Sequence, residues 1–328
     1  MIKSRVEELT SNFDKNLLVV GDVMLDRFVW GSVDRFSPES PACPVLEFER
    51  ETKMLGGAGN VAANLVSLGA RSVHLTGLVG RDAEGQELQR LIGHGKIEDI
   101  LLMGERPTTT KTRYVAEDRH LLRFDRENTE LSSEHDSQII IDRIREWANV
   151  MCRRGAVVLQ DYAKGAVTPF LVRELMKLAK EVDMPVFVDP KSDLWPFFKE
   201  AVLVKPNLPE AMSAFGVVGK EHEGLVERWG RSMLKYTRAG AVVVTRGKDG
   251  MSLFTETEEA WAVPQPVDVV DVSGAGDTSM ATLVLSRLAG ATWVEAMSLA
   301  NAAAGIAVGK CGTSTVTTDE LLDRYPKE

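Results

Sequence analysis

The sequence predicts an α/β protein: a mainly parallel central sheet covered by helices on both faces, as three α/β/α layers, with a small β lid. Short apolar runs alternate with longer amphipathic segments along most of the 328 residues. This alternation is typical of parallel strands that are buried on both faces. Two segments, 27–50 and 108–125, instead carry polar alternation and, in the first, several prolines, which predicts exposed antiparallel strands outside the main sheet.

The individual elements follow from the position of each run. Apolar runs predict strands at 16–22, 72–77, 156–161, 186–189, 201–204, 241–245 and 266–270. Helices are expected at 5–14, 58–68, 84–93, 134–152, 168–182, 224–238, 279–285 and 292–308. Polar residues follow four of the strands, namely Asp22, Asp161, Asp189 and Asn207. Ligands of open parallel sheets bind at the carboxyl ends of the strands, so we expect a site there.

Composition limits the class of protein. The formal net charge of −9 argues against nucleic acid as the main partner. The first residues lack the apolar core of a signal peptide, and no apolar run is long enough to span a bilayer. We therefore expect a cytoplasmic protein with no membrane partner, organised as one domain over 1–328 with lid strands within 27–50 and 108–125. A sheet as small as this lid needs a partner surface, either its own domain or a second copy, and we favour a homodimer.

The loop Asp271-Val272-Ser273-Gly274-Ala275-Gly276-Asp277-Thr278 precedes an apolar helix and is the most informative stretch. Small residues at a helix start let backbone N–H groups approach an anion closely. The carboxylate of Asp277 would repel an anion, but it fits a group that takes a proton from an attacking hydroxyl. The alternative is that Asp277 and Thr278 only cap the helix.

A second glycine loop, Gly56-Gly57-Ala58-Gly59-Asn60, also begins a helix with small residues. It differs from a dinucleotide fingerprint in spacing, and no clean strand precedes it, so an NAD-dependent dehydrogenase is disfavoured. Asn60 is predicted either to bond a polyol hydroxyl or to cap the helix. No Walker loop is present, so any use of ATP would not involve a P-loop.

Further polar positions follow the later strands. Asn207 and Glu210 suit Mg²⁺ from the start of a helix, or form a helix cap. The loop from Thr245 to Gly250 is either a hairpin or part of a nucleotide pocket. The helix beginning at Asn301 has a face of small residues that fits either adenine or close helix packing. In Asp189-Pro190-Lys191, a carboxylate and an ammonium group lie beside the expected cleft, where Lys191 can meet a phosphate.

Together these motifs resemble the PfkB (ribokinase-like) family of carbohydrate kinases in an order that covers nearly the whole chain. The stretch 56–65 resembles the first family signature. The loop 271–278 resembles the second, with Val272 in place of the usual Thr. Asn207 and Glu210 match the Asn-x-x-Glu motif of the family. The resemblance implies a ribokinase-like fold and an enzyme that uses ATP and Mg²⁺, and in several members also K⁺.

The resemblance also implies residue roles. Asp277 matches the catalytic base, and the amides of Gly274, Ala275 and Gly276 match the anion hole for the transferred phosphate. The sugar hydroxyls are assigned to Asp22, Gly57 and Asn60, and the nucleotide to Asn207, Thr245, Gly247 and Asn301. The Mg²⁺ shell is assigned to Glu210, acting through water, and a monovalent cation is assigned to Asp271 and Ser273. The lid matches a dimer clasp of some relatives.

Within the family, residues 21–26, 35–45, 109–114 and 188–191 are similar to D-glycero-β-D-manno-heptose 7-phosphate kinases. This similarity implies a stand-alone kinase that makes heptose 1,7-bisphosphate on the route to ADP-heptose and lipopolysaccharide. A sugar-phosphate substrate carries a second anionic group, which Lys191, Arg113 and Arg123 could bind. Asp189 is assigned to the same substrate site. The alternative for the two arginines is surface charge on the lid. Two other functions stay open: another sugar or sugar-phosphate kinase, of the ribokinase or tagatose 6-phosphate kinase type, and a non-catalytic sensor with the same fold.

Overall fold

A large central sheet organises the chain. The computed structural model describes residues 1–117, 119–151, 155–191, 194–215, 225–264 and 267–326. Nine strands pair in the order β15-β14-β13-β12-β11-β10-β1-β4-β6, and all neighbours are parallel except β13 with β14 and β14 with β15. The strands are β1 (Asn16–Gly21), β4 (Ser72–Thr76), β6 (Glu98–Asp99), β10 (Gly155–Gln160), β11 (Val186–Asp189), β12 (Leu203–Val204), β13 (Ala241–Thr245), β14 (Met251–Phe254) and β15 (Glu259–Ala262).

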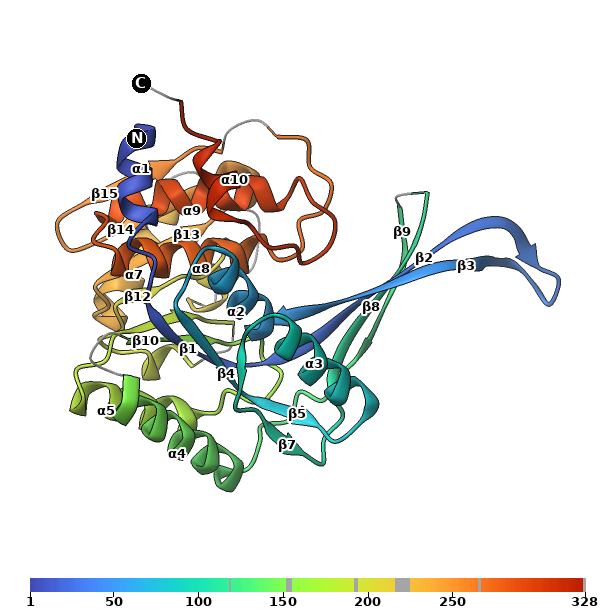
Figure 1. Ribbon diagram of the computed structural model, residues 1–328, viewed down its shortest axis with the longest axis horizontal. Coiled ribbons are helices and arrows are strands. Elements are labelled where there is room, and N and C mark those ends of the chain that lie inside the picture. Colours follow the sequence, from blue (N-terminus) through green and yellow to red (C-terminus); the bar gives the residue numbers. More distant parts are fainter. Residues whose placement is uncertain (118, 152–154, 192–193, 216–224, 265–266, 327–328) are drawn as a thin grey trace.

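Helices cover both faces of this sheet (Figure 1). One layer contains α1 (Lys3–Thr10), α2 (Ala58–Ser67), α3 (Ala83–His94), α8 (Ala275–Leu288), α9 (Trp293–Ala307) and α10 (Thr318–Leu322). The other contains α4 (Glu134–Met151), α5 (Pro169–Glu181), α6 (Leu208–Ser213) and α7 (Leu225–Thr237). The three-layer α/β prediction is thus confirmed.

Strand β1 shows why the sheet has two cores. Leu17 and Val19 pack in the first hydrophobic cluster, whereas Leu18 and Val20 pack in the second. Successive side chains of a strand point to opposite faces, so an uninterrupted apolar run fills both layers at once. This explains why the buried strands read as continuous apolar runs in the sequence.

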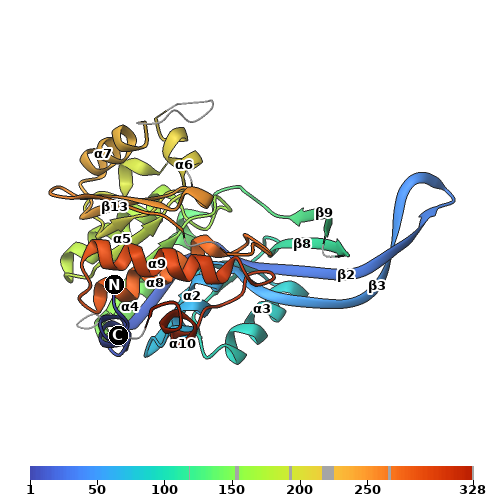
Figure 2. The same cartoon turned by 90° about the horizontal axis from the view of Figure 1, so that it is seen from above.

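The lid is a separate four-stranded sheet that extends away from the main body (Figure 2). Its order is β3-β2-β8-β9, formed by β2 (Val23–Ser37), β3 (Ser40–Gly57), β8 (Thr109–Ala116) and β9 (Arg119–Arg126). The expectation of purely antiparallel lid strands is wrong, because β2 and β8 pair in parallel. Between these two strands the chain forms β3 and then, over residues 58–108, helices and strands of the main body, so β8 returns to the lid in the direction of β2.

Three further expectations about elements need correction. The described residues 267–270 form no strand, and the 201–204 run contributes only Leu203–Val204 to the sheet. A strand does precede the first glycine loop, since β3 continues to Gly57. A short pair, β5 (Leu78–Gly80) with β7 (Leu102–Gly104), was not expected. None of the described helices combines the length and apolar character needed to cross a bilayer.

Candidate active site

Three neighbouring strands bring their carboxyl ends to one place. Gly21 at the end of β1 pairs with Gln160 at the end of β10, and Gln160 pairs with Asp189 at the end of β11. Asp22 and Asp161 follow directly. The predicted convergence of polar residues at the strand ends is confirmed, and the glycine loop before α8 lies against the same edge through contacts of Asp277.

The glycine loop holds the start of α8 open for an anion. Gly274 is the N-cap residue with a left-handed φ of 79°, and no side chain caps the helix. A Cβ at Gly274 would lie 2.6 Å from Nδ2 of Asn60, so only glycine fits there without displacing that side chain. Gly276 is exposed, and the first backbone N–H groups of a helix lack intrahelical acceptors. The N–H of Ala275 makes a long hydrogen bond, 3.5 Å, to the carbonyl of Val272, so the exposed amide of Gly276 is the one most accessible to a negatively charged group.

Asp277 is buried in the first turn of α8, with a side chain that bonds other elements and does not cap its own helix. Asn60 Nδ2 donates to Oδ2 at 2.8 Å, Tyr162 Oη donates to Oδ1 at 2.7 Å, and Gln160 Nε2 donates to Oδ1 at 3.2 Å. The cap alternative is wrong for Asp277. It is wrong for Asn60 as well, since Asn60 lies inside α2.

Burial controls the electrostatics of this carboxyl group. Loss of solvent raises the pKa of Asp277 to about 7, although the hydrogen bonds from Asn60 and Tyr162 oppose that rise. The charge of Asp189 raises it further and that of Lys205 lowers it. A carboxyl group with a pKa near neutrality suits proton transfer at neutral pH.

Behind Asp277 a chain of buried polar groups leads to a lysine. Gln160 Nε2 also donates to Oδ2 of Asp189 at 3.0 Å, and Lys205 Nζ lies 2.9 Å from the same oxygen. A Cβ at Gly276 would lie 3.9 Å from Lys205 Nζ. Lys205 therefore places a buried positive charge beside the anion-binding loop, where it can act on a phosphate as well as on Asp189.

Asp22 organises the loop after β10. Its carboxylate accepts the backbone N–H groups of Tyr162 and Lys164 at Oδ2 and of Ala166 at Oδ1, at 2.7–3.0 Å. Burial raises the pKa of Asp22, and these amides oppose the rise. Gly57, with a φ of 57°, has its Cβ position only 2.4 Å from the carbonyl oxygen of Asp22. Asp22 therefore fixes the loop that carries Tyr162, and the close approach of Asp22 requires glycine at position 57.

Three of the four predicted nucleotide residues line one cavity of about 450 Å³, and Asn207 is not among its lining residues. Thr245 and Gly247 come from the β13–β14 turn, Asn301 from α9, and Ala275 and Gly276 from the anion loop. The turn joins two antiparallel strands, so the hairpin alternative is correct, and the same turn also lines the cavity. Because this cavity opens onto the anion loop, a nucleotide base bound in it would direct its phosphates toward Gly276.

Asn207 and Glu210 form a reciprocal cap at α6. Asn207 Oδ1 accepts the N–H of Glu210 at 2.9 Å, and Glu210 Oε2 accepts the N–H of Asn207 at 2.7 Å. The capping alternative is thus correct for this pair. Burial raises the pKa of Glu210 to about 7, and the charge of Asp189 contributes, so three carboxyl groups crowd this region around Lys205.

Asp271 ties the loop before α8 to the chain that follows α9. Its Oδ1 accepts the N–H of Ser273 at 2.9 Å, and its Oδ2 accepts the N–H of Gly312 at 3.1 Å. These bonds hold the two loops together beside Gly274, whose Cβ position lies 3.2 Å from Cα of Thr313.

The basic residues of the lid differ in their surroundings. Arg113 is buried and pairs with Asp26 at 2.5 Å, so the expectation that it is only surface charge is wrong. Arg123 is exposed and pairs with Asp125 at 3.0 Å. Lys191 Nζ lies 5.3 Å from the centre of the Tyr162 ring, on the main body.

Four residues of this site escaped the sequence analysis: Asp26, Gln160, Tyr162 and Lys205. A usable signal existed for Gln160 and Tyr162, because they flank Asp161 at the end of an apolar strand. Lys205 also follows a strand, and its buried position opposite Asp189 depends on the pairing of β11 with β12.

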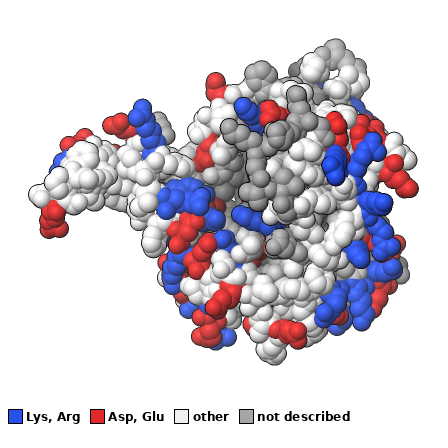
Figure 3. Space-filling view, turned by 180° about the vertical axis from the view of Figure 1, so that it is seen from behind, with Lys and Arg blue, Asp and Glu red and all other residues white. Residues whose placement is uncertain are grey.

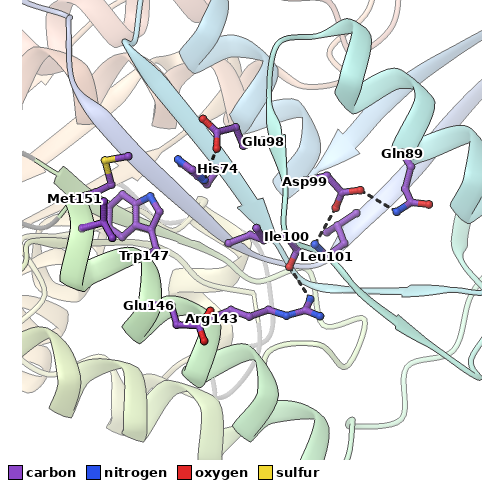
Figure 4. A pocket seen from close by; sticks show the side chains of 11 residues that line it. His74, Gln89, Glu98, Asp99, Ile100, Leu101, Arg143, Glu146, Trp147 and Met151 are labelled. Atoms are coloured by element: carbon purple, nitrogen blue, oxygen red, sulfur yellow. Dashed lines mark hydrogen bonds and ion pairs between the residues drawn. The ribbon is translucent and has the colours of Figure 1, made fainter.

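Another cavity lies elsewhere, beside β6 and α4 (Figure 4). His74 and Trp147 line it together with Asp99 and Arg143, and its volume is about 540 Å³. Arg143 donates to the carbonyl of Ile100, and Asp99 accepts from Gln89. None of the predicted site residues lines this cavity, so its size does not mark it as the active site.

Comparisons of sequence point to one family. The family model described as pfkB family carbohydrate kinase matches residues 14–320. The chain is 43% identical to a D-beta-D-heptose 7-phosphate kinase of Bordetella bronchiseptica, over 93% of this chain and 94% of that protein. It is also 43% identical to a bifunctional protein HldE of Caulobacter sp., over 93% of this chain. The chain spans 62% of the length of that bifunctional relative.

Solved structures share the fold. Phosphofructokinase-2 from Escherichia coli, in complex with potassium, aligns with a TM-score of 0.80 at 20% identity, over 94% of this chain and 97% of that one. Ribokinase from Thermotoga maritima aligns with a TM-score of 0.70 at 18% identity, over 94% and 98%. The ribokinase-like fold prediction is therefore confirmed.

Proposed function

The chain belongs to the pfkB family of carbohydrate kinases, and we propose that it transfers the γ-phosphate of ATP to the C1 hydroxyl of D-glycero-β-D-manno-heptose 7-phosphate. The product would be heptose 1,7-bisphosphate. The observation that carries this substrate is the 43% identity, over nearly the full length of both chains, to a relative named for heptose 7-phosphate. The site supports it with a buried carboxyl group beside an open helix start.

We assign the role of general base to Asp277. A carboxylate has about four lone-pair positions, two on each oxygen. Oδ1 already accepts two hydrogen bonds, from Tyr162 and Gln160, whereas Oδ2 accepts one, from Asn60. Oδ2 is therefore the oxygen with a free position for the proton of the sugar hydroxyl. The oxygen so activated attacks the γ-phosphate, and ADP leaves with the electrons of the broken P–O bond.

Charge stabilisation comes from the anion loop. The backbone N–H groups of Gly274, Ala275 and Gly276, at the start of α8, would bind the transferred phosphate, and Lys205 adds a buried positive charge nearby. Phosphoryl transfer requires mainly positioning and electrostatic stabilisation from the protein. Groups fixed by the start of α8 supply both without rearranging during the reaction.

The chemistry of the acidic residues fits a divalent cation. Asp189 lies close enough to Glu210 for its charge to raise the pKa of Glu210. The buried Lys205 forms an ion pair with Asp189. Mg²⁺ suits one or two carboxylates plus waters and nucleotide phosphates, so Glu210 would hold it through water. When bound, Mg²⁺ neutralises charge on the phosphates. We also retain Asp271 and Ser273 as candidate residues for K⁺.

A substrate panel tests the proposed reaction. We expect ADP release with heptose 7-phosphate to exceed that with ribose or fructose 6-phosphate by at least an order of magnitude in kcat/KM, because differential binding of the transition state sets specificity. If the enzyme prefers ribose or fructose 6-phosphate, the assignment of heptose 7-phosphate is wrong and the enzyme acts on another sugar used by the family. ATP binding without turnover of any sugar would support a sensor.

Replacing Tyr162 by phenylalanine tests the environment of Asp277. We expect kcat/KM of the native enzyme to rise with pH through about 7, because the base must be deprotonated. Tyr162 donates to the carboxylate, so its loss raises the pKa of Asp277 and moves the inflection of the pH–rate profile to higher pH.

The control for that experiment is Glu210→Gln, because the pKa of Glu210 is also about 7. If the inflection belongs to Asp277, it persists in Glu210→Gln and moves only in Tyr162→Phe. An unchanged profile in Tyr162→Phe would contradict the proposed tuning.

We further propose a homodimer through the lid. Leu122 and Phe124 pair with Tyr114 and Thr112 on one face of the lid and are 59% and 57% exposed. A sheet with an exposed apolar face gains stability by covering it. We expect Phe124→Glu to convert a dimer into a monomer at micromolar concentration in light scattering. The control Val263→Glu lies outside the lid and should leave the mass unchanged; a native monomer would refute the proposal.

A further inference from the structure

The lid has two chemically different faces. Cross-strand pairing places Asp26 opposite Lys111, Lys111 opposite Asp125, and Arg113 opposite Arg123. Directly opposed residues in a sheet point to the same side. One face of the lid therefore carries these charged residues, whereas Leu122 and Phe124 lie on the other.

The charged face lies toward the active-site loops of the main body. Burial is the main cause of the lowered pKa of Lys111, and the charge of Asp125 opposes it. The charges of Lys164 and Lys191, both from loops after the central strands, lower the pKa further, as does that of Arg123. Lys164 belongs to the loop held by Asp22, and Lys191 lies over the ring of Tyr162. Basic side chains gather where the lid joins the main body, with acidic ones among them (Figure 3).

Most of these charges are already paired. Arg113 pairs with Asp26, Arg123 with Asp125, and Lys164 with Glu127 at 2.7 Å. Lys111 and Lys191 have no such ion pair within the described part of the chain. Of five cations and three acids, two positive charges are left uncompensated, which matches the charge of about −1.5 to −2 on a phosphate monoester at pH 7.

Lys111 is the more informative of the two lysines. It is half-buried, and burial is the main cause of its lowered pKa. The two acids opposite Lys111, Asp26 and Asp125, are already paired with Arg113 and Arg123, so a further anion would stabilise this half-buried ammonium group. Lys191 is exposed, and its charge acts on Glu210 as well as on Lys111, so it lies within electrostatic reach of both residues.

We propose that Lys111 of the lid, together with Lys191 and Lys164 of the main body, binds the phosphate that the sugar substrate already carries. The inference rests on the proposed function and names the residues that select a phosphorylated sugar. The Tyr162 ring, with its hydroxyl on Asp277 and Lys191 on its face, separates this phosphate site from the base. The acceptor hydroxyl and the existing phosphate are thus held at different ends of one sugar.

The test compares two sugars in three enzymes. Heptose 7-phosphate and the same heptose without phosphate are assayed with native enzyme, Lys111→Met and Lys53→Met. Lys53 belongs to the same lid but pairs with Arg27, one residue after Asp26, so it lies on the opposite face. A charge-assisted hydrogen bond contributes about 1.5–3 kcal/mol, roughly 10- to 100-fold in affinity.

We expect Lys111→Met to lower kcat/KM for the phosphorylated sugar by about 10- to 100-fold, mainly through KM. Its kcat/KM for the phosphate-free sugar should stay at the native value, and Lys53→Met should match native enzyme with both sugars. Equal losses with both sugars in Lys111→Met would mean a structural role, and no loss would mean no contact. Either result overturns the assignment.

A binding measurement separates this inference from the proposed reaction. Inorganic phosphate is titrated calorimetrically into enzyme saturated with a non-hydrolysable ATP analogue, which occupies the anion loop. We expect native enzyme and Lys53→Met to bind phosphate and Lys111→Met to bind it at least tenfold more weakly. If no sugar phosphate is turned over but this difference persists, the proposed reaction fails and the phosphate site stands; equal binding by all three refutes the site.

Discussion

Replacing Asp277 by asparagine is expected to lower kcat by roughly a thousandfold, within the range for loss of a general base. This carboxyl group lies in the first turn of α8, next to the anion loop, and has a pKa near 7. Asparagine has the same shape but cannot accept the proton of the sugar hydroxyl. Steady-state ADP release measures kcat, and calorimetry with ATP measures binding, which should survive because the nucleotide cavity does not involve this side chain.

The matched control is Asp268→Asn. Asp268 is exposed, lies nine positions earlier in the same connection, and takes no part in the contacts of Asp277. We expect native kcat for this variant. Near-native turnover by Asp277→Asn, with circular dichroism showing a native fold, would remove Asp277 as the base and leave catalysis to the anion loop.

A single methyl group at Gly274 is expected to have the second-largest effect. Gly274→Ala places Cβ 2.6 Å from Nδ2 of Asn60, which is too close for any carbon–nitrogen contact, in a backbone with a φ of 79°. Asn60 must then move away from Asp277, to which it donates. We expect kcat to fall by about 10²-fold, as for small misplacements of a catalytic group, and the free energy of unfolding to fall by about 1–3 kcal/mol.

Gly290→Ala is the control that separates the effect of backbone strain from the effect of displacing Asn60. Gly290 also has a positive φ, of 90°, but no atom lies within 4 Å of its Cβ position. This variant should lose a similar backbone contribution to stability and keep native kcat. Unfolding in urea and steady-state kinetics on both variants give the comparison; equal kcat values would show that the position of Asn60 does not matter.

The fold was predictable because its signals are local. The apolar run 16–22 is buried on both faces and reads as a central strand, and the observed β1 matches it to within one residue. The parallel pairing of β2 with β8 was not predictable, since 58–108 separate the two strands and the direction of β8 depends on where the main body returns the chain. Residues 266–270 have strand composition, yet their described part forms no strand, because propensity without a partner strand is weak.

The candidate site also has parts that the sequence predicts and parts that it does not. The glycine loops and the Asn207–Glu210 pair carry short-range patterns, and the comparisons support the family to which those patterns pointed. Gln160 and Tyr162 carry no such pattern. Their roles depend on contacts with Asp277 across 117 and 115 positions of the sequence. No periodicity or spacing encodes a contact of that separation.

By itself, the sequence determined the strand-helix alternation, the lid segments and the loop that begins α8, because hydrophobic periodicity and glycine conformation act over a few residues. Only the tertiary structure decided which side chains of these segments contact one another and how those contacts change their charge state. It placed Asp277 among Asn60, Tyr162 and Gln160, where burial raises its pKa to about 7. It also paired Arg113 with Asp26 and left Lys111 facing the main body. Burial and charge pairing are properties of packed neighbours, and packing is settled when distant segments meet.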